Sequence, residues 1–106
     1  MSWQVELYEG VEDQILTMPP KIQARVIHLL ELIEKHGGNL GAPHTEPMGE
    51  GLFELRAKAM EGIGRAFFCY QKGQHIIVLH AMVKKSQKTP KKDLKIARKR
   101  MQEVQQ

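Results

Sequence analysis

One apolar stripe in the first third of the chain constrains its fold more than any other feature. Apolar side chains recur at i, i+4, i+7, i+8 and i+11, namely at Ile22, Val26, Leu29, Leu30 and Ile33. This spacing places all of them on one side of an α-helix. Pro19-Pro20 precedes the stripe and Gly37-Gly38 follows it, and these residues suit the start and the end of a helix. The sequence therefore predicts a long amphipathic helix that packs on another layer.

Two shorter elements precede this helix. Trp3, Val5 and Leu7 alternate with polar residues, which is the spacing of a strand. Residues 9–16 predict a short helix that buries Val11 and Ile15 and ends before the two prolines. Two helices around a tight turn also suggest a DNA-binding helix-turn-helix. The apolar second helix argues against it, because a recognition helix must offer polar side chains to bases.

Three strand-like runs follow a segment, residues 37–51, that is rich in Gly and Pro and is predicted to be a loop. His44 lies alone in that loop, and we expect it to be exposed. In the first run, residues 53–58, alternation places Glu54, Arg56 and Lys58 on one face. The second run covers residues 63–71. The third, residues 76–84, is almost wholly apolar and is predicted to be central in the sheet.

The short links between these runs predict an antiparallel meander, with Lys72-Gly73 as one tight turn. A last helix is expected to begin at Thr89-Pro90, with Thr89 as its N-cap. The fold class is then α+β: one domain over residues 1–106, with a small antiparallel sheet of about four strands in the order β-α-α-β-β-β-α. The predicted core includes Leu29, Leu30, Ile33, Leu55, Phe67, Val78 and Leu79.

Composition excludes several functional classes. A single cysteine, Cys69, excludes an intrachain disulfide and a cysteine-based metal site, and fits a reducing cytoplasm. No basic segment followed by an apolar run opens the chain, so we expect no signal peptide. No apolar stretch approaches the length that spans a membrane. Phosphate-binding glycine loops and HExxH-type metal pairs are missing too. We therefore expect a cytoplasmic protein without cofactor or metal.

Positive charge is concentrated at the C-terminal end. Residues 84–106 contain nine Lys and Arg but only two acidic residues, Asp93 and Glu103, whereas residues 1–83 contain seven basic and ten acidic residues. This asymmetry favours an anionic partner for the last quarter of the chain. A solvated basic helix without a partner would give the same pattern.

Clustered cations suit metal-free RNA cleavage. In that reaction the ribose 2′-hydroxyl attacks the neighbouring phosphate, and catalysis needs a base, an acid for the 5′-oxygen and stabilisation of the phosphorane charge. Arg56 and Arg65 on rigid strands could stabilise that charge. The predicted sheet gathers them near Lys84 and Lys85 at the end of the third run.

Three segments resemble the RelE/HigB toxin superfamily, and in particular its phage-related HigB-like branch. They are Gly51-Leu52-Phe53-Glu54-Leu55-Arg56, then Arg65-Ala66-Phe67-Phe68-Cys69-Tyr70, and Val83-Lys84-Lys85-Ser86-Gln87-Lys88-Thr89-Pro90. The last is the most specific. The resemblance spans nearly the whole chain, including the order of its elements.

The resemblance implies a type II toxin that cleaves messenger RNA, usually on the ribosome, and that a helix-turn-helix antitoxin neutralises. It also allows a toxin–antitoxin heterotetramer. Arg56 and Arg65 match the sheet arginines expected to bind the scissile phosphate, and Lys84 and Lys85 match the basic end of the last strand. Further contacts to RNA are expected from Lys58, Lys88, Lys91, Lys92 and Lys95.

The acid and the base are less defined, because the last helix has no Tyr or His, unlike that of several family members. Glu54, His80 and a lysine of the 84–85 pair are candidates. Glu54 could instead pair with Arg56 or Arg65, and His80 could simply be packed in the core. Two other functions fit the same residues: a non-catalytic RNA- or ribosome-binding module, and a ParE-like toxin that inhibits DNA gyrase.

Overall fold

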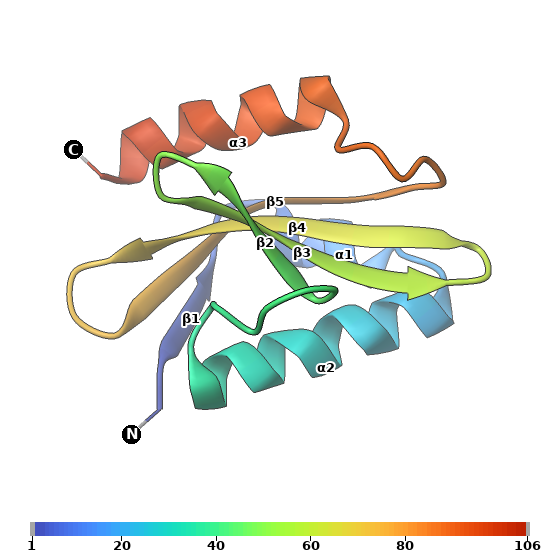
Figure 1. The fold of residues 1–106 in the computed structure, drawn as a ribbon, viewed down its shortest axis with the longest axis horizontal. Helices are drawn as coiled ribbons and strands as arrows, with labels where there is room; N and C mark the ends of the chain where they lie inside the picture. Colours follow the sequence, from blue (N-terminus) through green and yellow to red (C-terminus); the bar gives the residue numbers. More distant parts are fainter. Residues whose placement is uncertain (1, 106) are drawn as a thin grey trace.

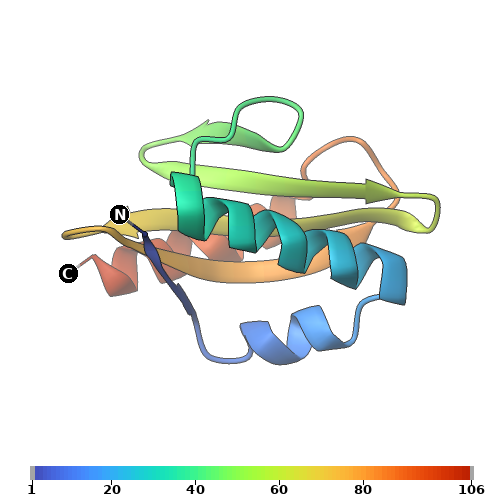
Figure 2. The ribbon, with the colours of Figure 1, turned by 90° about the horizontal axis from the view of Figure 1, so that it is seen from below.

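A five-stranded sheet lies between two helical layers in the computed structural model, which describes residues 2–105 (Figure 1). The elements in chain order are β1 (Gln4–Leu7), α1 (Val11–Leu16), α2 (Pro20–His36), β2 (Thr45–Gly49), β3 (Leu52–Ala59), β4 (Gly62–Gln71), β5 (His75–Lys84) and α3 (Lys91–Val104). Helices α1 and α2 cover one face of the sheet and α3 covers the other (Figures 1 and 2). No helix within residues 2–105 is long and apolar enough to cross a membrane.

The strand order is β1-β5-β4-β3-β2. Strands β3 to β5 form the predicted antiparallel meander, β2 extends it by pairing with β3, and β5 is an interior strand as expected. The α+β class is confirmed, but the sheet has five strands instead of four and is mixed, because β1 pairs with β5 in parallel. The additional strand, β2, lies in the segment predicted to be a loop. It is an edge strand, where a proline such as Pro47 is tolerated, and its pairing with β3 outweighs its weak strand propensity.

Helix α2 packs closely on the sheet through the predicted stripe. Ile22, Val26, Leu29 and Ile33 are buried, whereas Leu30, predicted to lie in the core, is only half-buried. Gly64 of β4 allows the close approach. A Cβ at this position would lie 2.5 Å from a methyl carbon of Ile22, so any larger residue would push the helix outward.

Helix α3 packs on the opposite face through Ala97 and Met101, which are buried against β4 and β5. Two arginines fix its position by donating to backbone carbonyls. Arg98 bonds to the oxygen of Met48 at 2.7 Å, and Arg100 bonds to that of Leu79 at 2.7 Å. These bonds tie the C-terminal helix to β2 and to the middle of β5.

Residues 85–90 connect β5 to α3, and we call them the basic turn. Thr89 does not cap the helix as predicted: α3 begins at Lys91, its N-cap residue is Pro90, and no side chain caps it. The Thr89 hydroxyl instead donates to Oε1 of Glu54 at 3.3 Å. The sequence pattern placed the helix start within two residues but missed that Thr89 faces the sheet.

Candidate nucleic-acid interface and active site

Two arginines and one glutamate form a charged cluster on the face of the sheet that α3 covers. Arg56 of β3 lies directly opposite Arg65 of β4 in the antiparallel register. Glu54 lies on the same face two residues before Arg56, because side chains alternate along a strand. Arg56 Nε donates to Glu54 Oε1 at 2.6 Å, and Arg65 Nε lies 3.4 Å from Glu54 Oε2. One carboxylate therefore serves two guanidinium groups.

The two arginines differ in exposure. The Arg56 side chain is 21% exposed, whereas Arg65 and Glu54 are fully buried. Burial lowers the pKa of the Arg65 guanidinium, and the Glu54 carboxylate opposes that shift. An arginine nevertheless stays charged at neutral pH. Arg65 Nε and Nη1 and Glu54 Oε2 have no hydrogen-bond partner among the described residues, although buried polar atoms usually have one.

Both guanidinium groups also hold the basic turn. Arg65 Nη2 donates to the carbonyl oxygen of Ser86, and Arg56 Nη2 donates to that of Gln87 at 2.8 Å. Arg56 Nη2 also contacts the Thr89 hydroxyl at 3.4 Å. The turn therefore lies over Arg65 and leaves Arg56 at its margin. In this arrangement the Arg65 side chain is shielded from solvent, and its direct contact with phosphate stays a prediction.

The predicted lysines surround this cluster in solvent. Lys58 on β3 and Lys84 at the end of β5 are exposed, and so are the lysines of the basic turn and of the first turns of α3: Lys85, Lys88, Lys91, Lys92 and Lys95. Arg56 is thus the partly exposed member of the charged cluster, and it lies between the buried pair Glu54–Arg65 and the exposed lysines.

Glu54 and His80 are both buried and bonded to other side chains. This environment does not suit the proton-transfer role considered for them. His80 is 6% exposed, and its Nε2 lies 2.7 Å from Asp93 Oδ1. Its Nδ1 lies 3.3 Å from the side-chain nitrogen of Gln14. The Gln14 oxygen accepts from the amide of Ala81, so the Gln14 nitrogen must donate to His80. His80 therefore joins α1, β5 and α3. Glu54 pairs with both arginines, which is the alternative role that the sequence left open for it.

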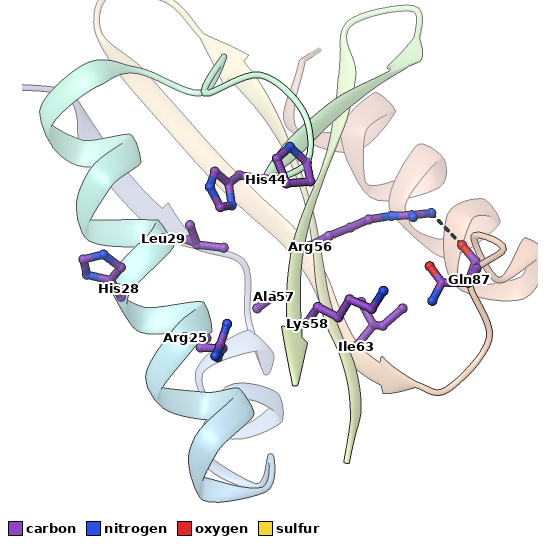
Figure 3. Close-up of a pocket in the computed structure, with 10 residues that line it drawn as sticks. Arg25, His28, Leu29, His44, Arg56, Ala57, Lys58, Ile63 and Gln87 are labelled. Carbon is purple, nitrogen blue, oxygen red and sulfur yellow. Dashed lines mark hydrogen bonds between the residues drawn. The ribbon is translucent and has the colours of Figure 1, made fainter. Parts of the chain in front are cut away.

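A basic cleft of about 350 Å³ lies beside this cluster, at the edge of β3 (Figure 3). It brings together Arg25 and His28 of α2, His44 of the α2–β2 loop, and Arg56 and Lys58 of β3. Arg25 and His28 lie off the apolar stripe of α2, and His44 was expected to be exposed in its loop. None of the three is buried, but no local pattern could show that they converge on one cleft.

The described residues hold no group of three or more His, Cys, Asp or Glu side chains that could bind a metal ion. The charged side chains that reach solvent around the cluster are Arg56 and the exposed lysines. Rigid guanidinium groups on strands are suited to planar, bidentate recognition of phosphate.

Comparison with known proteins identifies the class. The chain belongs to the family of phage-derived Gp49-like proteins (DUF891), whose model matches residues 13–102. No curated protein sequence matches it significantly.

Solved structures show that the fold is that of RelE toxins. A double arginine mutant of the E. coli toxin RelE in the free state matches with a TM-score of 0.70 over 95% of this chain and 99% of that chain, at 8% identity. The archaeal RelE–RelB complex from Pyrococcus horikoshii OT3 gives a TM-score of 0.58 at 16% identity, covering 78% of this chain and 96% of that one. The toxin–antitoxin complex RelBE2 from Mycobacterium tuberculosis gives 0.54 at 15% identity, covering 79% and 100%.

Proposed function

We propose that this protein is the toxin of a type II toxin–antitoxin system, and that it is a metal-independent endoribonuclease that cleaves messenger RNA on the ribosome. Cleavage of translated messages would inhibit translation in the cytoplasm. The observation that carries the proposal is the Arg56 guanidinium. Glu54 holds it rigidly at 2.6 Å, and it reaches solvent among exposed lysines on a RelE-like fold.

In the proposed reaction, the 2′-oxygen of a ribose forms a bond to the adjacent phosphorus, and the bond from phosphorus to the 5′-oxygen breaks. The products are a 2′,3′-cyclic phosphate and a 5′-hydroxyl. The 2′-hydroxyl proton leaves to a base, and the 5′-oxygen receives a proton from an acid. Arg56 stabilises the charge of the phosphorane by donating to its oxygens. We assign the acid to Lys84 or Lys85, because both are exposed where β5 meets the basic turn.

Arg65 contributes in two ways in this proposal. Its buried charge positions Glu54 and, through the Ser86 carbonyl, the basic turn. Its Nη1 donor has no hydrogen-bond partner among the described residues, so it can donate to a phosphate oxygen once the turn moves aside. Lys58, Lys88, Lys91, Lys92 and Lys95 bind the RNA backbone, because flexible exposed lysines contact phosphates without regard to sequence.

A protein antitoxin is the proposed partner. Two of the similar solved structures are complexes between a RelE-family toxin and its antitoxin, and the family resemblance favours an antitoxin of the helix-turn-helix type and a heterotetramer. A small reading frame next to this gene that encodes such a protein would support the pairing. Co-expression should then abolish toxicity, and failure to do so would contradict it.

The direct test is cleavage of a defined message on purified ribosomes. The parent protein should cut the ribosome-bound message and leave cyclic phosphate ends. Message that is bound but not cut would indicate the non-catalytic RNA- or ribosome-binding alternative. Inhibition of DNA gyrase with intact message would instead indicate the ParE-like alternative.

A further inference from the structure

The basic cleft at the edge of β3 has the size and composition of a ligand site. Its volume, about 350 Å³, lies within the range usual for small-molecule pockets. Buried apolar side chains line it, namely Leu29 of α2, Ala57 of β3 and Ile63 of β4. His28 of α2 and His44 of the α2–β2 loop also line the cleft (Figure 3).

The charge of the cleft selects an anion. Of the ten residues that line it, five have basic side chains and none has an acidic one. They come from three separate elements, so no single amphipathic face explains their convergence. Carboxylates, by contrast, are present on the same helix outside the cleft, at Glu31 and Glu34.

The two imidazole rings and the apolar lining add a preference for a flat, partly apolar group. Unstacked RNA bases bind by stacking on aromatic rings, histidine included, and on the guanidinium plane of arginine. The cleft offers His28, His44 and the Arg25 guanidinium for this purpose. A simple inorganic anion would leave the apolar part of the cleft unused.

The cleft is also continuous with the proposed reaction site. Arg56 and Gln87 both line it, and the Arg56 side chain extends from the cleft toward the basic turn, where it bonds to the Gln87 carbonyl (Figure 3). Strand β2 pairs only with the first half of β3, from Thr45 opposite Leu55 to Gly49 opposite Leu52. One further backbone bond follows, from the Arg56 amide to the carbonyl of His44 at 2.9 Å. Within residues 2–105, the second half of β3 therefore has no strand beside it on this edge of the sheet.

We infer that this cleft binds one nucleotide of single-stranded RNA next to the cleaved position. Its base lies against the rings of His28 and His44, and its phosphate lies between Arg25 and Lys58. The inference rests on the proposed function for the identity of the strand. It adds a binding site on the α2 side of β3, separate from the lysines near α3.

Histidine resonances test this inference without requiring cleavage. The chain has five histidines, whose ring signals can be assigned with single His→Asn variants. The probe is a 2′-O-methyl RNA trinucleotide, which binds but cannot undergo attack by its own 2′-oxygen. The signals of His28 and His44 should shift on titration, whereas those of His36 and His75, which lie outside the cleft, should not. The inference fails if His28 and His44 do not shift, if all exposed histidines shift alike, or if only an antitoxin protein shifts them.

Matched variants connect the site to activity. The double variant His28→Ala, His44→Ala should weaken RNA affinity roughly tenfold, since base stacking is worth about 1–3 kcal/mol, and leave the rate at saturating ribosome near that of the parent. The control, Lys35→Ala with His36→Ala, alters the last turn of the same helix and should change neither. If the parent cleaves but the cleft variant keeps full affinity, the inference is wrong and the proposed function stands. If the signals shift but the parent never cleaves, the proposed function is wrong and the nucleotide site stands.

Discussion

The carboxylate of Glu54 and the guanidinium of Arg65 lie 3.4 Å apart with neither side chain exposed to solvent. Removing one partner of such a pair strongly destabilises the folded state, because the remaining charge is left buried without a partner. Glu54→Gln should therefore lower the free energy of unfolding by about 3–5 kcal/mol, measured by urea denaturation. Glu61→Gln, at an exposed turn residue, is the control and should change it by less than about 0.5 kcal/mol. Equal stability of both variants would contradict a structural role for the ion cluster.

Arg65→Ala should mainly destabilise the protein, since it removes a fully buried side chain as well as a partner of Glu54. Arg56→Ala is the cleaner probe of chemistry, because Arg56 is partly exposed and Glu54 keeps Arg65. We expect Arg56→Ala to slow single-turnover cleavage about 10²-fold or more and to lower stability less than Arg65→Ala does, because Glu54 keeps Arg65 as a partner. Lys72→Ala, at the exposed β4–β5 turn, is the control. Parental rates for both variants would exclude Arg56 from the site.

The lysines divide into two groups. Lys88, Lys91, Lys92 and Lys95 should each bind phosphate, so neutralising one should weaken RNA association regardless of sequence. The slope of the logarithm of the association constant against the logarithm of the salt concentration should become less steep. The change should be about 0.7 for each phosphate of a single strand that the variant no longer neutralises. Lys84 and Lys85 should instead alter the single-turnover rate at saturating ribosome. The division is wrong if the first group changes only that rate, or if the second changes only salt-dependent binding.

Cys69 tests the packing between the sheet and α3. Burial raises the pKa of its thiol from 9.0 to about 11. A raised pKa means that the folded state favours the protonated thiol, so its contribution to stability is complete below pH 9 and is lost as pH rises toward 11. Stability of the parent should fall over this range more steeply than that of Cys69→Ala. Native protein should also resist thiol reagents at about pH 8, where a thiol of ordinary pKa already reacts as its thiolate, and rapid labelling there would contradict the packing.

Sequence periodicity was enough to predict most of the fold. The Ile22–Ile33 stripe, the short helix that buries Val11 and Ile15, and the three strands of the meander follow from side-chain spacing alone. Strand β2 could not be predicted in this way, because it depends on pairing with β3 and not on its own residues. The parallel pairing of β1 with β5 is likewise a long-range contact that no local pattern encodes.

Within the candidate site, the sequence predicted that the two arginines share a face, but not how the surrounding segments are arranged. Alternation along β3 and β4 placed Arg56 and Arg65 on one face, and their register confirms that they lie opposite each other. The basic turn covers Arg65 and contacts Glu54 through Thr89. Its position depends on hydrogen bonds between segments that are distant in the sequence. Arg25, His28 and His44 line one cleft only because the fold brings α2 and the α2–β2 loop together, which no local sequence pattern shows.

The most direct test of the proposed nuclease is the chemistry of RNA ends after single-turnover incubation with ribosomes programmed with a defined message. We expect cleavage by the parent protein and fragments with 2′,3′-cyclic phosphate and 5′-hydroxyl ends. Arg56→Ala should lose at least about 99% of that rate, in line with removal of one transition-state donor. Intact message in the presence of folded, ribosome-bound parent protein would contradict the proposal, as would cleavage that leaves a 5′-phosphate.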